Sequence, residues 1–272
     1  MRPGAVHPQV ESRGKAPQRR IPYNCKTTAD CGKVIDDLSW DSNFLGLKTG
    51  RLHCDREEQL LECLANIKGD HYQLIYVFSD TAIDVRPADC RLIDVGGQVT
   101  YSKSLEITRQ SREQEHSEDS IGIYQGPDEN ESLLQLALLS GHLSRFRVDP
   151  WLPPGSFERL YRQWLLNNLQ NKESSRVYIS GHSEDPEGIL TTTWKQAHGT
   201  IDLLAVRQDS QGKGIGSKLL EHIENEAVKY SAHQIDVKTQ MINNAARRTY
   251  ERNGYSLKLS LIHISEPTRP RL

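Results

Sequence analysis

A glycine-rich turn between an apolar segment and a helical segment constrains this chain more than any other feature. The apolar segment reads Thr200-Ile-Asp-Leu-Leu-Ala-Val206, the turn reads Gln211-Gly-Lys-Gly-Ile-Gly216, and a helical pattern continues to Tyr230. The first backbone N–H groups of a helix lack intrahelical acceptors, and the helix dipole makes that end partially positive. Glycines let a large anion approach the backbone closely. The segment therefore predicts a strand, a phosphate-binding turn and a helix in succession.

The glycine spacing excludes one common phosphate motif and weakens another. A P-loop needs G-x-x-x-x-G-K-[ST], whereas here Gly212 is followed by Gly214 and Gly216. The dinucleotide fingerprint requires a third glycine where this chain has Ser217, and a first glycine close to the strand end. Taken alone, the turn is better explained as an ordinary helix start.

Composition and charge limit the classes of protein to consider. A chain of 272 residues is enough for one large domain or two small ones. The formal net charge of −2 gives no reason to expect nucleic acid or an anionic membrane as a partner. No apolar run is long enough to cross a bilayer, and we expect no secretory leader. The five cysteines include no C-x-x-C pair, which favours free thiols in the cytoplasm and no metal site.

The chain divides by composition into a polar start, a small α/β domain, a charged linker and a larger unit. We expect these to be a disordered tail at 1–30, the small domain at 31–110, the linker at 111–130 and the larger unit at 131–258. In the small domain, the patterns predict a turn at Trp40–Phe44, a helix at 57–68, and strands at 48–53, 73–78, 92–95 and 98–101. In the larger unit they predict helices at 131–140, 157–168, 214–230 and 243–251, and strands at 176–180, 188–194, 200–206 and 234–238.

The C-terminal segment departs from the rest of the chain. Residues 259–272 read like a translated sequencing adapter, so we expect a non-native tail there and a missing final strand. Loss of that strand would expose a sheet edge.

Two motifs in sequence order carry a resemblance to a known family. Gln211-Gly-Lys-Gly-Ile-Gly216 resembles the Q/R-x-x-G-x-G/A loop of the GNAT N-acetyltransferase superfamily, and Asn243-Asn-Ala-Ala246, Tyr250 and Gly254-Tyr255 resemble its N-x-x-A-x-x-x-Y-x-x-x-G-[FY] segment. The resemblance implies a GNAT fold of the α/β (α+β) class, with a mixed central sheet and flanking helices behind the smaller α/β domain. It also implies acetyl-CoA as co-substrate and direct attack in a ternary complex.

The same resemblance implies which residues contact the co-substrate. Backbone N–H groups at the turn would hold the CoA pyrophosphate, and the pantetheine would pair with a bulged strand that splays from residues 235–238. A backbone N–H near Leu204 would face the acetyl carbonyl, and the Tyr250 hydroxyl would protonate the leaving thiolate. The implied binding residues are Leu204, Ala205, Val206, Gln211, Gly212, Lys213, Gly214, Ile215, Gly216, Ser217, Asn243 and Tyr250.

Some assignments stay open at the level of sequence. Lys213 and Arg207 could add positive charge at the turn or lie in solvent. Asn243 could cap a helix, contact CoA, or do both. Asp202, Glu187 and His198 are candidates for the general base by placement alone, and a chain of water molecules is the alternative.

A narrower resemblance concerns the acceptor. Trp40-Asp-Ser-Asn-Phe-Leu-Gly, Arg91-Leu-Ile-Asp-Val, Trp151-Leu-Pro-Pro, Phe157–Trp164 and Thr239-Gln-Met241 are similar to TDP-fucosamine N-acetyltransferases. This implies a nucleotide-linked amino sugar as the small-molecule partner, and an N-terminal domain that either binds nucleotide or supports a homodimer. A protein N-terminus, a polyamine or an amino acid is the alternative acceptor, and an acyl-CoA sensor without turnover is the alternative function.

Overall fold

The computed structural model describes residues 35–54, 56–66, 72–79, 93–105 and 121–267. Their strands form a single ten-stranded sheet in the order β1-β2-β3-β10-β4-β9-β8-β7-β6-β5. The strands are β1 (Ile35–Asp37), β2 (Thr49–His53), β3 (Leu74–Ser79), β4 (Ile93–Ser104), β5 (Ile121–Ile123), β6 (Ser175–Gly181), β7 (Pro186–Lys195), β8 (His198–Val206), β9 (Gln234–Gln240) and β10 (Ser256–Pro267). The parallel pairs are β2–β3 and β8–β9, and the other paired neighbours are antiparallel.

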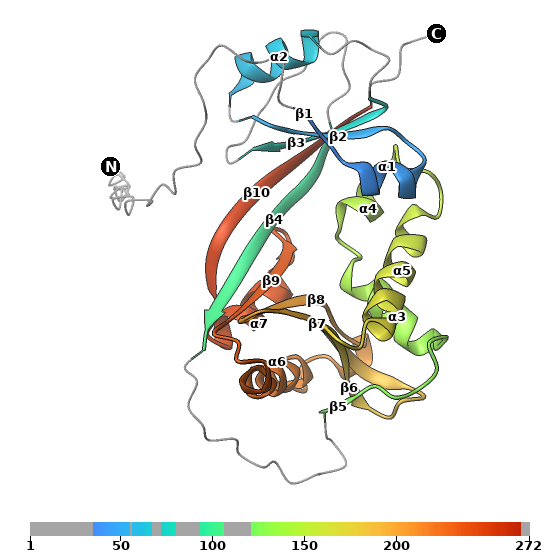
Figure 1. Cartoon of the computed structure of the whole chain (residues 1–272), viewed down its shortest axis with the longest axis vertical. Helices are drawn as coiled ribbons and strands as arrows, with labels where there is room; N and C mark the ends of the chain where they lie inside the picture. The colour runs from blue at the N-terminus through green and yellow to red at the C-terminus, as the bar shows by residue number, and fades with distance from the viewer. Residues whose placement is uncertain (1–34, 55, 67–71, 80–92, 106–120, 268–272) are drawn as a thin grey trace, which may run out of the picture.

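Helices cover both faces of the β5–β9 part of the sheet (Figure 1). Leucines of α3 and α5 pack with Ile189 and Leu203 on one face, and the apolar side of α6 packs with Leu190 and Ile201 on the other. The helices are α1 (Ser39–Leu45), α2 (Glu57–Asn66), α3 (Glu131–Ser140), α4 (Arg145–Val148), α5 (Ser156–Gln170), α6 (Ile215–Glu226) and α7 (Asn244–Arg252), with short 3-10 turns η2 (Gln208–Ser210) and η3 (Ala227–Tyr230). No helix in the described ranges is both long and apolar enough to cross a membrane.

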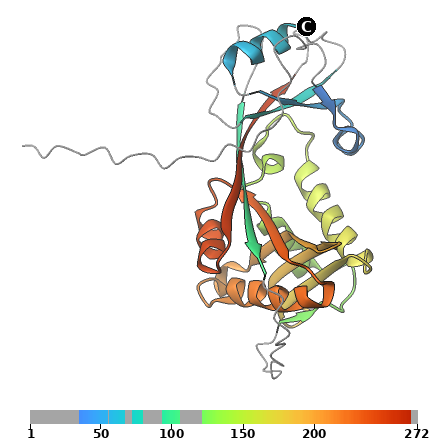
Figure 2. The same ribbon diagram turned by 60° about the vertical axis from the view of Figure 1, so that its left-hand side comes forward.

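Two long strands connect the N-terminal part of the sheet to the rest (Figure 2). β4 pairs with β9 through residues 98–104, and β10 lies between β4 and β3. The expected division at residues 111–130 therefore does not separate two sheets, although residues 106–120 and 1–34 lie outside the described ranges. Within the expected linker, β5 pairs with β6. The sheet is continuous from the small N-terminal layer to the helix-covered part.

The prediction of a missing final strand is wrong. Residues 256–267 form β10, which pairs with β4 from Ser256 to Ser265 and with β3 from Ile262 to Pro267. A strand needs backbone partners on its edges more than a particular sequence. The unpaired edges of β3 and β4 supply those partners.

The predicted turn at Trp40–Phe44 is also wrong, because these residues belong to helix α1. The Trp40 and Phe44 rings stack with centroids 5.1 Å apart, which is the i,i+4 contact of a helix. Gly46 ends the helix in a left-handed conformation at φ 68°. The polar residues that suggested a turn instead serve the helix, since the Ser42 hydroxyl accepts the backbone N–H of Thr49 at 2.9 Å.

Candidate active site

A bulge in β8 shapes the centre of the site. In the β7–β8 register Thr191 faces Leu203 and Thr192 faces Ile201, so Asp202 is the extra residue. The bulge reverses the alternation of the strand: Ile201 packs toward α6, whereas Leu203 packs toward α3 and α5. The expectation of a bulged strand at this position is confirmed.

A gap opens between β8 and β9 directly after the bulge. The two strands pair from His198 with Gln234 to Ile201 with Val237, and within the described residues their register ends there. β9 continues to Gln240 along β4 instead. The two strands therefore splay, as the resemblance implied.

The N–H groups on this part of β8 alternate between β7 and the gap. The Leu203 N–H bonds the Thr191 hydroxyl at 3.1 Å and the Arg207 N–H bonds the Glu187 carbonyl at 2.7 Å, so both point toward β7. Because successive N–H groups of a strand point in opposite directions, those of Leu204 and Val206 face the gap. This side of β8 is a free strand edge that an extended ligand could pair with.

The glycine turn connects the end of β8 to α6. Gly212 and Gly214 have φ of 80° and 81°, values that side-chain-bearing residues rarely adopt, and Gly214 is the N-cap of α6. The first backbone hydrogen bond of α6 runs from the Lys218 N–H to the Gly214 carbonyl, at 3.0 Å. The Gln211 N–H donates to the Gln208 carbonyl at 3.4 Å, whereas the N–H groups from Gly212 to Ser217 precede the first helical bond and are available to an anion.

The two basic side chains near the turn contact carboxylates. Arg207 pairs with Asp185 and Asp209 at 2.9 and 2.8 Å, and Lys213 lies 3.9 Å from Glu187. Their charge is thereby shared with protein groups. The backbone of the turn is the stronger candidate for holding a phosphate.

A cleft of about 670 Å³ begins at the gap and extends to the N-terminal part of the sheet. Leu204 and Tyr250 line it, as does Asn243, whose side chain caps α7 by accepting the Ala246 N–H at 3.1 Å. Tyr250 is 3% exposed, and burial raises its pKa above the ordinary value for a phenol. The phenol therefore keeps its proton at neutral pH, and as a weaker acid it can give that proton only to a strong base beside it, such as a thiolate.

The structure distinguishes among the three candidates for the general base. Asp202 lines the cleft. Glu187 instead accepts a hydrogen bond from the Ser210 hydroxyl at 3.0 Å beside the glycine turn, and His198 lies 3.4 Å from Asp236. Neither of these two side chains lines the cleft.

Sequence reasoning missed much of the cleft wall. The wall includes hydroxyls of β6 and β7, an arginine of α4 and a tryptophan of α1: Ser175, Thr193, Arg145 and Trp40. Only the run Thr191-Thr192-Thr193 in a predicted strand could have drawn attention, because alternate hydroxyls there must face the interior. The described residues include no cluster of His, Cys, Asp or Glu able to hold a metal ion.

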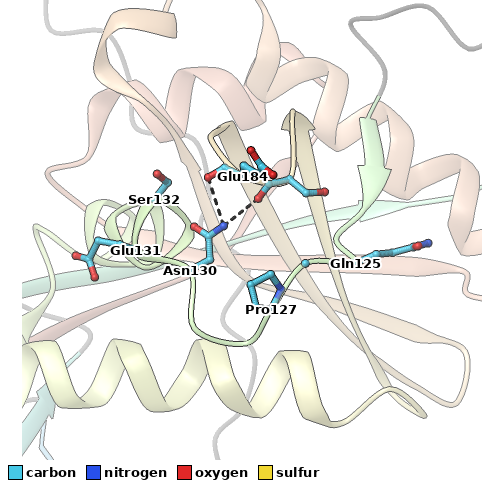
Figure 3. A pocket seen from close by; sticks show the side chains of 8 residues that line it. Gln125, Pro127, Asn130, Glu131, Ser132 and Glu184 are labelled. Atoms are coloured by element: carbon cyan, nitrogen blue, oxygen red, sulfur yellow. Dashed lines mark hydrogen bonds between the residues drawn. The ribbon is translucent and has the colours of Figure 1, made fainter.

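A second pocket of about 570 Å³ lies at the start of α3 and contains none of the predicted site residues. Figure 3 shows the Asn130 amide directed at the backbone of the β6–β7 connection, where it donates to the carbonyl of Ser183 at 2.9 Å. The Asn130 side chain also caps α3 by accepting the Leu133 N–H. These contacts fix the local fold and leave the cleft as the candidate site.

Comparison with known proteins agrees with this geometry. Residues 139–255 match the acetyltransferase (GNAT) family. The chain contains a GNAT acetyltransferase domain. It is an acyltransferase domain of the kind that uses acetyl-CoA, and it includes the splayed strands, the glycine turn and Tyr250. The start of the GNAT match within α3 leaves β1–β4 and their helices outside it.

Two curated relatives extend the comparison. The chain is 26% identical over 226 residues to dTDP-fucosamine acetyltransferase of Escherichia coli O6:H1, covering 82% of this chain and 94% of that protein. It is 27% identical over 134 residues to spore coat polysaccharide biosynthesis protein SpsD of Bacillus subtilis (strain 168), covering 49% of this chain. The second match spans 46% of SpsD, so less than half of that relative is compared.

A solved structure shows the same fold. A functionally unknown conserved protein from Staphylococcus epidermidis ATCC 12228 superposes with a TM-score of 0.54 and 16% identity, covering 81% of this chain and 84% of that one. Together with the GNAT family match, this likeness gives the protein a mixed α/β GNAT fold, as predicted.

Proposed function

We propose that the protein transfers acetyl from acetyl-CoA to the primary amine of a nucleotide-linked 4-amino-4,6-dideoxy sugar in the cytoplasm. The observation that carries the proposal is the extent of the cleft. It runs from Leu204 and Tyr250 at the splayed strands to Trp40 of α1 and Gly96 of β4. We call the part of the cleft lined by Trp40, Asp41, Gly96 and Arg145 its second arm. A cleft that extends this far beyond the reactive end suits an acceptor larger than a simple amine.

The reactive end accounts for the co-substrate. The N–H groups from Gly212 to Ser217 would hold the pyrophosphate, and the free edge of β8 would pair with the pantetheine amides. The acetyl carbonyl would then accept the Leu204 N–H, which stabilises the oxyanion that forms during attack. Tyr250 would give its proton to the CoA sulfur as the C–S bond breaks.

The second arm has the side chains that a nucleotide sugar needs. Trp40 is 49% exposed and stacks one ring face on Phe44, which leaves an aromatic surface for a base. Arg145 lines the arm and can donate guanidinium hydrogen bonds to a diphosphate, although it shares its charge with Asp41 at 3.4 Å. Amides along the wall can bond sugar hydroxyls; they belong to Gln98, Asn167, Asn168 and Asn171.

The relatives support the same acceptor class. One is named a dTDP-fucosamine acetyltransferase and the other a spore coat polysaccharide biosynthesis protein, and both names concern sugar chemistry. The first aligns with 82% of this chain, far more than the residues of the GNAT match.

An acceptor panel tests the proposal. Purified protein with acetyl-CoA is incubated with dTDP-linked amino sugars, free amino sugars, polyamines, amino acids and peptides, and released CoA is measured with a thiol reagent. We expect the largest kcat/KM with a dTDP-linked 4-amino sugar. Release that is fastest with a peptide or polyamine would contradict the acceptor class. Tight acetyl-CoA binding with no release on any amine would indicate a sensor.

A further inference from the structure

We propose that Asp202 binds the ammonium group of the acceptor and removes the proton that must leave before attack. This inference rests on the proposed amine acetyltransfer but not on the identity of the amine. The bulge is what makes the assignment specific, because Asp202 is the extra residue that it introduces into β8. Bulges redirect side chains next to active sites.

The position of Asp202 brings it to the reacting groups. It lies two residues before Leu204, whose N–H faces the gap, and it lines the same cleft as Leu204 and Tyr250. An amine held at this carboxylate would lie in the part of the cleft that also contains the proposed oxyanion donor and the proposed acid. One ligand-accessible space thus contains all three groups that acyl transfer to an amine requires.

Hydroxyls of the two neighbouring strands fix the orientation of the carboxylate. The Thr193 hydroxyl donates to Asp202 Oδ2 at 2.7 Å, and the Ser175 and Thr193 hydroxyl oxygens are 3.3 Å apart. Because Thr193 has one proton and gives it to Asp202, its oxygen accepts from Ser175. The series Ser175, Thr193, Asp202 crosses β6, β7 and β8 and leaves the second carboxylate oxygen for a ligand.

The charge of Asp202 is not balanced by the protein. Among the described residues its only polar partner is the Thr193 hydroxyl, and no neighbouring cation influences its ionisation. The side chain is reached by solvent through the cleft, yet the surrounding protein atoms desolvate it and raise its pKa, against the smaller opposing effect of the Thr193 bond. A carboxylate in such a place favours a cationic ligand, and a primary amine is a cation at neutral pH.

The proton balance is complete with Asp202 and Tyr250. Asp202 takes one proton from the ammonium group, and the neutral nitrogen attacks the acetyl carbon. The C–S bond then breaks, and the thiolate takes the Tyr250 proton. The second nitrogen proton returns to the Tyr250 oxygen as the amide forms. Asp202 finally releases its proton to water, so the products are the amide, CoA thiol and one proton.

The test is the pH dependence of the Asp202→Asn variant with whichever panel amine gives the highest kcat/KM. At pH 7 we expect the kcat/KM of the wild type to exceed that of the variant by about 10²–10³-fold, the range of a general base. Without the base, only the small fraction of neutral amine reacts. As the pH rises toward the pKa of the amine, the ratio of wild-type to variant kcat/KM should therefore fall by about tenfold for each pH unit.

A control and a binding measurement make every outcome decisive. His198→Gln replaces a residue outside the cleft and should keep the wild-type pH profile. Thr193→Val should give a smaller loss than Asp202→Asn with the same pH trend. The panel amines are also titrated calorimetrically into protein loaded with CoA, which cannot react, and Asp202→Asn should weaken binding at least tenfold.

The outcomes separate this inference from the proposed acceptor. The role of Asp202 is overturned, whatever the best amine is, if the ratio of wild-type to Asp202→Asn kcat/KM is constant with pH. It is also overturned if the two proteins bind the amine equally. A peptide or polyamine as the best amine, with the expected pH trend, contradicts the nucleotide sugar and supports Asp202. Failure of every amine to bind to the CoA complex overturns both.

Discussion

The backbone N–H of Leu203 donates to the side-chain hydroxyl of Thr191, 3.1 Å away on the neighbouring strand. In a regular antiparallel pair this N–H would bond a backbone carbonyl. The bulge at Asp202 leaves it without that partner, and Thr191, which is fully buried, supplies an oxygen instead. The shape of β8 at the splayed strands thus depends on one side chain of β7.

Replacing Thr191 with Val should remove that acceptor and leave a buried N–H unpaired. We expect the free energy of unfolding to fall by about 1–3 kcal/mol, measured by urea denaturation. The matched control is Thr192→Val, because the Thr192 hydroxyl is buried without a hydrogen-bond partner among the described residues. That change should be close to neutral. Equal destabilisation by the two substitutions would show that Thr191 does not support the bulge.

Gly214→Ala tests the anion site at the start of α6. An alanine in the left-handed conformation costs about 1–2 kcal/mol, and its methyl group would occupy the side from which a phosphate approaches. Gly155 is the N-cap of α5 with φ 74° and ψ 5°, nearly the geometry of Gly214. Gly155→Ala should therefore lower the melting temperature similarly but leave acetyl-CoA affinity unchanged by calorimetry. Loss of affinity in both variants, or in neither, contradicts a phosphate site at this turn.

Tyr250→Phe should separate chemistry from binding. We expect kcat to fall by about 10²–10⁴-fold, as for loss of a general acid, while acetyl-CoA affinity stays within about twofold. Tyr255→Phe is the control, since its ring lies 6.1 Å from that of Tyr250 in the same core but does not line the cleft. An unchanged kcat in Tyr250→Phe would remove this residue as the acid.

Shortening the chain to end at Lys258 should expose the edges of β3 and β4 that β10 covers. Unpaired strand edges are templates for association between chains. We expect a lower melting temperature and a shift to larger species in size-exclusion chromatography. A chain ending at Pro267 retains every paired residue of β10 and serves as the control. If both shortened chains melt together with wild type and stay the same size, β10 does not contribute to the stability of the sheet.

The glycine turn, α6, β9 and α7 could be predicted from sequence because their signals are local. The period of Leu219, Leu220 and Ile223 shows the buried side of α6, and Asn243 begins α7 as a cap. Asn243 and Tyr250, well downstream of the turn, were needed to connect it with acetyl-CoA. The signal for each element thus lies within a few residues, and only the link to acetyl-CoA required residues farther along the chain.

The cleft could not be predicted in the same way because it depends on long-range pairing. Thr193 reaches Asp202 through the β7–β8 register, which the bulge changes by one residue. Trp40 reaches the cleft through the placement of α1, which the sequence suggested was a turn. The position of β10 depends on the open edges of β3 and β4, and its own residues gave the opposite expectation.

The place of β10 also orders events during synthesis. β3 has β2 on one side and β10 on the other, yet β10 is the last element of the described chain to leave the ribosome. β1, β2 and β3 can form early, but one edge of β3 must wait until residues 256–267 have been made. Contacts of such high sequence separation slow folding, and an open edge during that delay is exposed to other chains. Ribosome stalling or a slow codon run before β10 would lengthen the interval in which a nascent chain is vulnerable to aggregation.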